Sequence, residues 1–164
     1  MRFEQLDFIP MTEADIPILT PIMKQAFEDD ARRYGRPDGG PDGYDDGEFL
    51  RKRIVLSDVE GYRIDLDGVT IGGILLFVHT KQHSGHLSCI FIDPSQMSAG
   101  YGAMAWRFVE HMYPRINTWT LNTSAVSYRN HCFYINKLGF HVVAVEGGKD
   151  RYTAMFQLKK ELER

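Results

Sequence analysis

The sequence has few of the residues from which disulfide frameworks and metal sites are built. It contains two cysteines in 164 residues, Cys89 and Cys132, and they do not have CxxC spacing. Both stand in apolar stretches, so we expect two buried, reduced thiols and not a disulfide or a metal pair. His111 and His131 fall in different predicted helices, with no carboxylate at ligand spacing. We therefore predict no metal site.

The chain also lacks an excess of positive charge and a long apolar run. Its formal net charge is −3, whereas a protein whose main ligand is nucleic acid needs a basic face. No apolar run approaches the length that spans a membrane. The segment Met1–Asp7 is polar and mixed in charge, unlike a secretory signal. We expect a cytoplasmic protein that binds neither nucleic acid nor a membrane.

The composition is that of a globular domain, with 43% hydrophobic and 25% charged residues. A chain of this length forms one buried core, so residues 1–164 are interpreted as a single domain. Thr12 followed by Asp15 resembles a capping box, and apolar residues recur behind it at helical spacing. Pro21 is expected to kink this helix or to delay its start.

The remaining elements follow from periodicity and turn residues. Asp67-Gly68 predicts a tight hairpin turn between two strands. The segment 36–47 is rich in Gly, Pro and Asp and is expected to be a loop. The sequence predicts strands at about 3–9, 62–66, 69–79, 86–92, 119–122, 140–145 and 152–158, and helices from about residue 16 and at 48–56, 101–112 and 127–138.

The most informative unit lies in mid-chain, where the apolar strand His86–Ile92 leads through the small-residue loop Ser95–Gly102 into a helix. The amides of the first helical turn are unpaired and lie at the positive end of the helix dipole, which favours an anion such as pyrophosphate. Gly100 and Gly102 would let the backbone approach a ligand closely. Many strand–turn–helix joints carry two glycines, so this unit alone does not identify a phosphate site.

The helix predicted at 127–138 carries Asn130, Tyr134 and Lys137 along one face. A polar stripe of this kind can simply be solvated. A tyrosine there also has a chemical use, because a phenol can donate a proton to a leaving thiolate.

Together these two stretches resemble the GNAT superfamily of N-acetyltransferases. The family signature is a strand, then Pro-x-x-Gln/Arg-x-x-Gly-x-Gly/Ala, then a helix, and Pro94, Gly100 and Gly102 fall in register with it. The second family motif, Phe-Tyr-x-Lys-x-Gly-Phe, is similar to the segment Phe133–Phe140. In this order and spacing the two motifs are far more specific than either alone.

The chain departs from the family pattern at two points. The Gln/Arg position is Met97, with Gln96 one place early, which removes a side-chain partner for the pyrophosphate. The second motif has one extra residue between Tyr134 and Lys137. Counting forward from Asn130 places Tyr134 at the family's catalytic position, whereas counting back from Gly139 places Ile135 there. We favour Tyr134 because no other phenol lies in that turn.

The resemblance implies an α/β (α+β) fold with a mixed, mostly antiparallel sheet of six to seven strands flanked by about four helices. It implies that acetyl-CoA is the cofactor and that an acetyl group passes directly to an amine. Tyr134 would protonate the thiolate, and a backbone N–H near Ile90 or Phe91 would polarise the carbonyl. The residues implied in holding coenzyme A are Ile90, Phe91, Ile92, Met97, Ser98, Ala99, Gly100, Tyr101, Gly102, Ala103, Asn130, Phe133 and Lys137.

The acceptor's proton needs a base, for which His86 is our candidate and His83 an alternative; each is also a common surface or hairpin residue. An acidic loop comprises Asp38, Asp42, Asp45, Asp46 and Glu48. It could attract a cationic acceptor, or it could be a solvated cluster of Asp-Gly turns. The expected partner is a small-molecule or peptide amine, and a homodimer is left open. The alternative function is a domain of the same fold that binds acyl-CoA without turnover.

Overall fold

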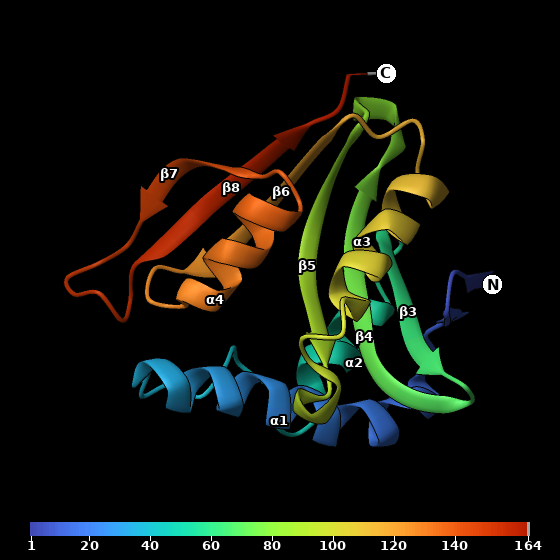
Figure 1. Cartoon of the computed structure of the whole chain (residues 1–164), viewed down its shortest axis with the longest axis horizontal. Coiled ribbons are helices and arrows are strands. Elements are labelled where there is room, and N and C mark those ends of the chain that lie inside the picture. Colours follow the sequence, from blue (N-terminus) through green and yellow to red (C-terminus); the bar gives the residue numbers. More distant parts are fainter. Residues whose placement is uncertain (164) are drawn as a thin grey trace.

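The computed structural model describes residues 1–163 and forms one eight-stranded sheet with helices on both faces (Figure 1). The helices are α1 (Ile16–Tyr34), α2 (Glu48–Ile54), α3 (Tyr101–Met112) and α4 (Tyr128–His131), and α4 continues as a π-helical segment, Cys132–Lys137. The strands are β1 (Arg2–Phe3), β2 (Leu6–Pro10), β3 (Val59–Leu66), β4 (Val69–His79), β5 (Ser84–Ile92), β6 (Thr118–Ser124), β7 (His141–Glu146) and β8 (Met155–Glu161).

The strand order is β1-β2-β3-β4-β5-β6-β8-β7, and every neighbouring pair is antiparallel except β5 and β6. The predicted mixed, mostly antiparallel sheet is therefore confirmed. It has one strand more than the upper expected number, because the predicted first strand is divided. Glu4 adopts φ 54°, and this turn folds β1 back onto β2.

The two faces of the sheet have separate cores. On one face, α1 and α2 cover Leu75, Cys89 and Phe91. On the other face, α3 and the end of the α4 segment cover a larger core that includes Trp106, Trp119 and other fully buried aromatic side chains. Because successive side chains of a strand point to opposite faces, β5 contributes to both cores. Two layers of helices thus fix β5 in the middle of the molecule.

Helix α1 begins as the sequence predicts and is not delayed by its proline. The capping box between Thr12 and Asp15 is present at a 3-10 turn, Glu13–Asp15, that leads directly into α1, and in it Thr12 N donates to Asp15 Oδ2 over 2.8 Å. Pro21 lies inside the helix, which runs on to Tyr34. Gly35 ends it in the left-handed conformation, with φ 68°. None of the helices in residues 1–163 combines the length and the apolar character needed to cross a membrane.

Candidate functional site

The central feature of the site is the point at which β5 and β6 separate. The two strands pair only from Ser84↔Thr118 to Leu87↔Leu121, and both then continue without pairing to each other. A β-bulge lies at the same place, because Leu75 opposes Cys89 while Leu76 opposes Leu87. In Figure 1 the two strands spread apart toward α1. The sheet therefore has an internal gap bordered by unpaired backbone.

The hydrogen-bonding pattern shows which β5 amides face this gap. Asp93 N donates to Ile71 O over 2.7 Å, so residue 93 is bonded to the β4 side. Bonded and non-bonded pairs alternate along an antiparallel ladder, so the amides of Ile90 and Ile92 point away from β4 and into the gap. The amide of Phe91 points toward β4. The expectation that Phe91 offers its amide to a ligand is therefore wrong, although its side chain lines the cavity described next.

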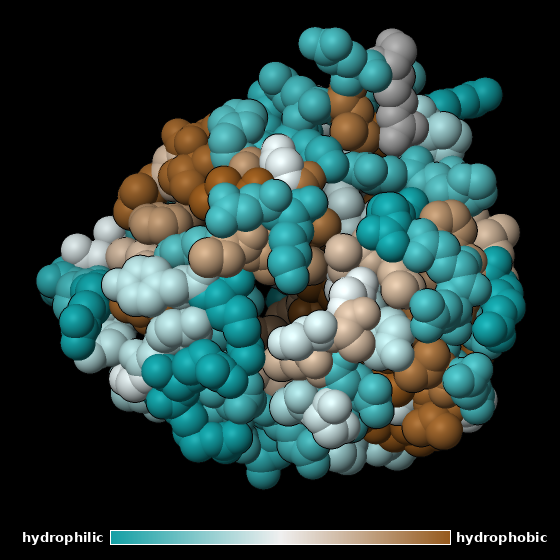
Figure 2. Space-filling model, viewed as in Figure 1, coloured by the Kyte–Doolittle hydropathy of each residue, from teal (hydrophilic) through white to brown (hydrophobic). Residues whose placement is uncertain are grey.

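A cavity of about 710 Å³ occupies the gap and extends to α1 and α2. Figure 2 shows a hollow near the middle of this face, with an apolar floor and a largely polar rim. The residues implied in holding coenzyme A, together with His86 and Tyr134, all line this cavity with one exception. They are His86, Ile90, Phe91, Ile92, Met97, Ser98, Gly100, Tyr101, Gly102, Ala103, Asn130, Phe133, Tyr134 and Lys137. The exception is Ala99, which lies in the exposed turn but not in the cavity wall.

The two glycines of the turn before α3 have different roles. Gly100 is the N-cap of α3 with φ 85°, and a side chain there would have open space but a strained backbone. At Gly102 an added Cβ would lie 3.0 Å from Phe133 Cζ. Gly102 thus allows α3 to approach Phe133, and its effect on a ligand would be exerted through that ring. The first-turn amides of this 12-residue helix have no helical carbonyl partner.

The extra residue of the second motif is accommodated by a π-helix. Leu138 N donates to Phe133 O over 3.1 Å, which spans five residues instead of four. A π-bulge accepts one additional residue without ending the helix. The residues before the bulge keep their helical register, and Tyr134 lies in the cavity wall. Ile135 packs against the core formed by α3 and the sheet.

Tyr134 is buried, with 9% of its surface exposed. Burial raises the pKa of its phenol well above the ordinary value, and it is raised further by Cys89, at the high pH at which that thiol ionises, and by the Asp30 carboxylate. Across residues 1–163 no group hydrogen-bonds to the Tyr134 hydroxyl. The side chain therefore presents a neutral, unpaired O–H group at the cavity, which is the state required of a proton donor.

His86 is the cavity histidine, and its environment keeps it neutral. Its Nδ1 lies 2.8 Å from Thr120 Oγ1. When Nδ1–H donates to this hydroxyl, Nε2 carries the lone pair that can accept a proton. Burial lowers the pKa of His86 below 6.5, and the charge of His79 lowers it further. The alternative, His83, is exposed, lies outside the cavity wall and has its Nδ1 2.9 Å from Arg115 O.

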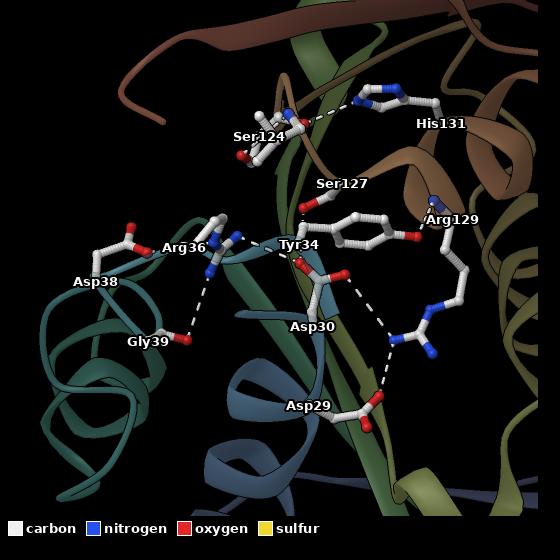
Figure 3. A network of polar contacts seen from close by, with 11 residues as sticks. Asp29, Asp30, Tyr34, Arg36, Asp38, Gly39, Ser124, Ser127, Arg129 and His131 are labelled. Carbon is white, nitrogen blue, oxygen red and sulfur yellow. Dashed lines mark hydrogen bonds and ion pairs between the residues drawn. The ribbon is translucent and has the colours of Figure 1, made fainter. Parts of the chain in front are cut away.

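A polar network that the sequence did not predict borders the cavity beside α1 (Figure 3). Asp30, which is 6% exposed, accepts from Ser127 Oγ over 2.6 Å and lies 3.4 Å from the Arg36 guanidinium. Arg129 pairs with Asp29 over 3.1 Å, and its backbone N donates to Tyr34 Oη over 2.8 Å. These contacts fix the start of α4, and with it Tyr134, to the end of α1.

The acidic loop does not form a concentrated anionic surface at the cavity. Only Asp38 lines the cavity, and it lies 3.2 Å from Arg36 Nε. Glu48 pairs with Arg51, and Asp46 accepts from the Glu48 amide. Asp42 and Asp45 are exposed and lie outside the cavity wall. Part of the cluster thus takes part in turn contacts and ion pairs, and an attraction of the loop for a cationic acceptor stays a prediction.

The two cysteines are free, but they differ from expectation in burial. Cys89 is buried, whereas Cys132 is exposed, because it lies on the cavity side of the π-helical segment. Burial raises the pKa of the Cys89 thiol to about 12, so this thiol stays protonated at neutral pH. Among the described residues, no group of three or more His, Cys, Asp or Glu side chains could hold a metal ion.

The chain resembles one curated sequence and many solved structures. It is 28% identical over 132 residues to an uncharacterized protein of Bacillus subtilis, YrkN, covering 80% of this chain and 70% of that protein. No protein-family model matches.

Three solved structures illustrate the structural likeness. A PaiA N-acetyltransferase from Thermoplasma acidophilum, in complex with coenzyme A, superposes with a TM-score of 0.76, 17% identity and coverage of 95% of this chain and 98% of that chain. A spermidine N-acetyltransferase from Vibrio cholerae, in complex with CoA and spermine, superposes with a TM-score of 0.70 at 14% identity, and the match covers 96% of both chains. A GCN5-related N-acetyltransferase from Rhodopseudomonas palustris superposes with a TM-score of 0.73 at 14% identity, and the match covers 99% of both chains. The chain therefore has the GNAT fold.

Proposed function

We propose that this chain is an acetyl-CoA-dependent N-acetyltransferase that transfers an acetyl group directly to a primary amine of a small molecule or peptide. The observation that carries the proposal is the gap between β5 and β6, which places unpaired β5 amides and the unpaired Tyr134 hydroxyl on one cavity. The solved relatives of this fold include N-acetyltransferases with coenzyme A bound.

The residues of the gap suit the chemistry of coenzyme A. The Ile90 and Ile92 amides can pair with the amide groups of a pantetheine arm, as one strand pairs with another. The turn at Gly100 and the first-turn amides of α3 form a concave donor set for a diphosphate. Lys137 lines the same cavity and adds a cation. Met97 offers an apolar contact where a polar side chain would add a hydrogen bond, so the backbone would carry more of the binding.

Each catalytic requirement has a candidate residue. Acetyl-CoA would supply an acetyl group activated as a thioester. The Ile90 N–H would donate to the carbonyl oxygen as negative charge develops there. Nε2 of neutral His86 would accept the amine proton, directly or through water. Tyr134 would donate its proton to the sulfur as the C–N bond forms and the C–S bond breaks. Proton exchange with solvent would restore both side chains, so amine and thioester yield amide and thiol.

The second candidate function is a domain that binds acyl-CoA without turnover. The departure at Met97 favours this alternative, because it removes a pyrophosphate partner found in the family signature. The two functions share the cofactor and differ only in chemistry.

One experiment tests both functions. Coenzyme A should raise the melting temperature of the purified chain, because a ligand that binds only the native state stabilises it, by about 2.7 kcal/mol at 100 times Kd. Acetyl-CoA and a panel of primary amines should then release free thiol and form N-acetyl products that mass spectrometry can identify. A thermal shift without turnover of any amine would favour the binding domain. The absence of a thermal shift would refute both.

A further inference from the structure

The acceptor side of the cavity contains charges whose balance bears on the substrate. The ionisable side chains that α1, α2, the loop between them and the start of α4 contribute to the wall are Asp30, Asp38, Arg36, Arg53 and Arg129. Three cations thus face two carboxylates. His86 adds no charge when neutral, since burial holds its pKa below 6.5.

Two of the three arginines are already compensated by carboxylates. Arg36 lies 3.4 Å from Asp30 and 3.2 Å from Asp38. Arg129 lies 3.1 Å from Asp29 and 3.9 Å from Asp30 (Figure 3). These pairs hold the chain segments together, and they leave little charge for a ligand.

Arg53 is the third arginine, and it has no carboxylate partner among residues 1–163. Its guanidinium lies over the Phe49 ring, 3.5 Å from the centroid, and one N–H donates to Phe49 O over 3.0 Å. Both contacts leave most of its five N–H donors unused. The stacking also fixes the guanidinium, so less side-chain entropy is lost when an anion binds.

Arg53 lines the same cavity as the residues at the reacting end of the gap. It acts on the Cys89 thiol, where it opposes the rise in pKa that burial causes. Cys89 immediately precedes Ile90, whose amide faces the gap, and Cys89, Ile90 and Tyr134 line the same cavity as Arg53. An anionic group bound at Arg53 would therefore share this cavity with an amine that reacts beside Ile90 and Tyr134.

The wall beside these charges is apolar. Phe27, Phe49 and Phe77 all line the cavity, as does Ala26. We propose that the acceptor is an α-amino acid with an apolar side chain, whose carboxylate pairs with Arg53 while its amine receives the acetyl group. This inference rests on the proposed N-acetyltransferase function and specifies its acceptor. The expected substrate is then a zwitterion, and not the cationic acceptor that the acidic loop could attract.

Matched pairs of amines that differ only in the carboxylate give a direct test. We would measure kcat/KM for L-phenylalanine against 2-phenylethylamine and for L-leucine against 3-methylbutylamine, each at equal concentrations of unprotonated amine. The wild-type chain should prefer the amino acid of each pair. A hydrogen-bonded charge contact is worth about 10- to 100-fold in kcat/KM, and Arg53→Gln should lose this factor for the amino acids while leaving the simple amines unchanged. Arg53→Lys, which keeps the charge, should retain part of the preference.

A binding measurement separates this inference from the proposed function. With the protein saturated by coenzyme A, L-phenylalanine should raise the melting temperature of the wild type further, and it should have no such effect on Arg53→Gln. Coenzyme A itself should stabilise both proteins equally, which also shows that the variant is folded. A preference for the simple amines, equal losses for both members of a pair in Arg53→Gln, or no thermal shift with any of the amino acids would overturn the inference.

Discussion

Replacing Tyr134 with phenylalanine removes one oxygen atom, and it separates catalysis from folding unusually well. The Tyr134 hydroxyl has no hydrogen-bond partner among the described residues, so its loss leaves no donor or acceptor unpaired. We expect the free energy of unfolding to change by less than about 1 kcal/mol. The ring remains in place against Phe133 and Phe140, and the shape of the cavity wall is kept.

The catalytic effect should be much larger than the effect on stability. A positioned general acid contributes roughly 10²–10⁴-fold, equivalent to about 3–5 kcal/mol of activation free energy. The raised pKa means that the phenol stays protonated through the neutral range, so Tyr134 should contribute no basic limb to the pH profile there.

The assay is initial-rate thiol release from acetyl-CoA with a saturating amine, with coenzyme A binding measured by thermal shift on the same samples. Tyr134→Phe should lower kcat by that factor and leave the coenzyme A shift unchanged. Ile135→Ala is the matched control, since Ile135 packs into the core and does not line the cavity. Its kcat should stay near the wild-type value. A loss of turnover in Ile135→Ala but not in Tyr134→Phe would refute the assignment.

Three further expectations concern other parts of the chain. Gly102→Val should displace Phe133, which should cost about 1–3 kcal/mol of folding free energy. Through this displacement it should weaken coenzyme A binding, and a coenzyme A thermal shift equal to that of the wild type would contradict this. Because burial lowers the pKa of His86, kcat/KM calculated for the unprotonated amine should stay level through neutral pH and fall only in acid, below the ordinary range of an imidazole; His86→Gln should abolish that acid limb as well as reducing the rate, and an unchanged profile would exclude His86 as the base. Although burial opposes it, hydrogen bonds from Thr12 and Arg63 lower the pKa of Asp15. Its stabilising contribution is therefore present above the unfolded pKa of about 3.9 and lost as pH falls through the folded value. Asp15→Asn should unfold more easily at pH 7, by about 1–3 kcal/mol, and the difference from wild type in chemical denaturation should shrink in acid.

Local rules determined most of the secondary structure from the sequence alone. The capping box at Thr12 and Asp15 sets the start of α1, and Asp67-Gly68 forms the turn of the β3–β4 hairpin with φ 49° and 81°. Apolar spacing located α3, and Gly100 of the glycine turn is the N-cap of this helix. These features depend on residues close together in the chain, whose conformational preferences can be inferred without knowledge of the rest of the fold.

Tertiary structure decided the features that depend on distant segments. The bulge opposite Leu75 and Leu76 and the end of pairing at Leu87 arise because β4, β5 and β6 meet in one sheet, and only this register shows that Ile90 faces the gap and Phe91 does not. The π-helix absorbs the extra residue of the second motif and leaves Tyr134 in the cavity. The sequence showed the acidic residues around position 42 but not their partners. Whether a charge is compensated depends on contacts such as Ser127 with Asp30, which are 97 residues apart. A sequence shows which charges exist, whereas the fold determines which of them are left for a ligand.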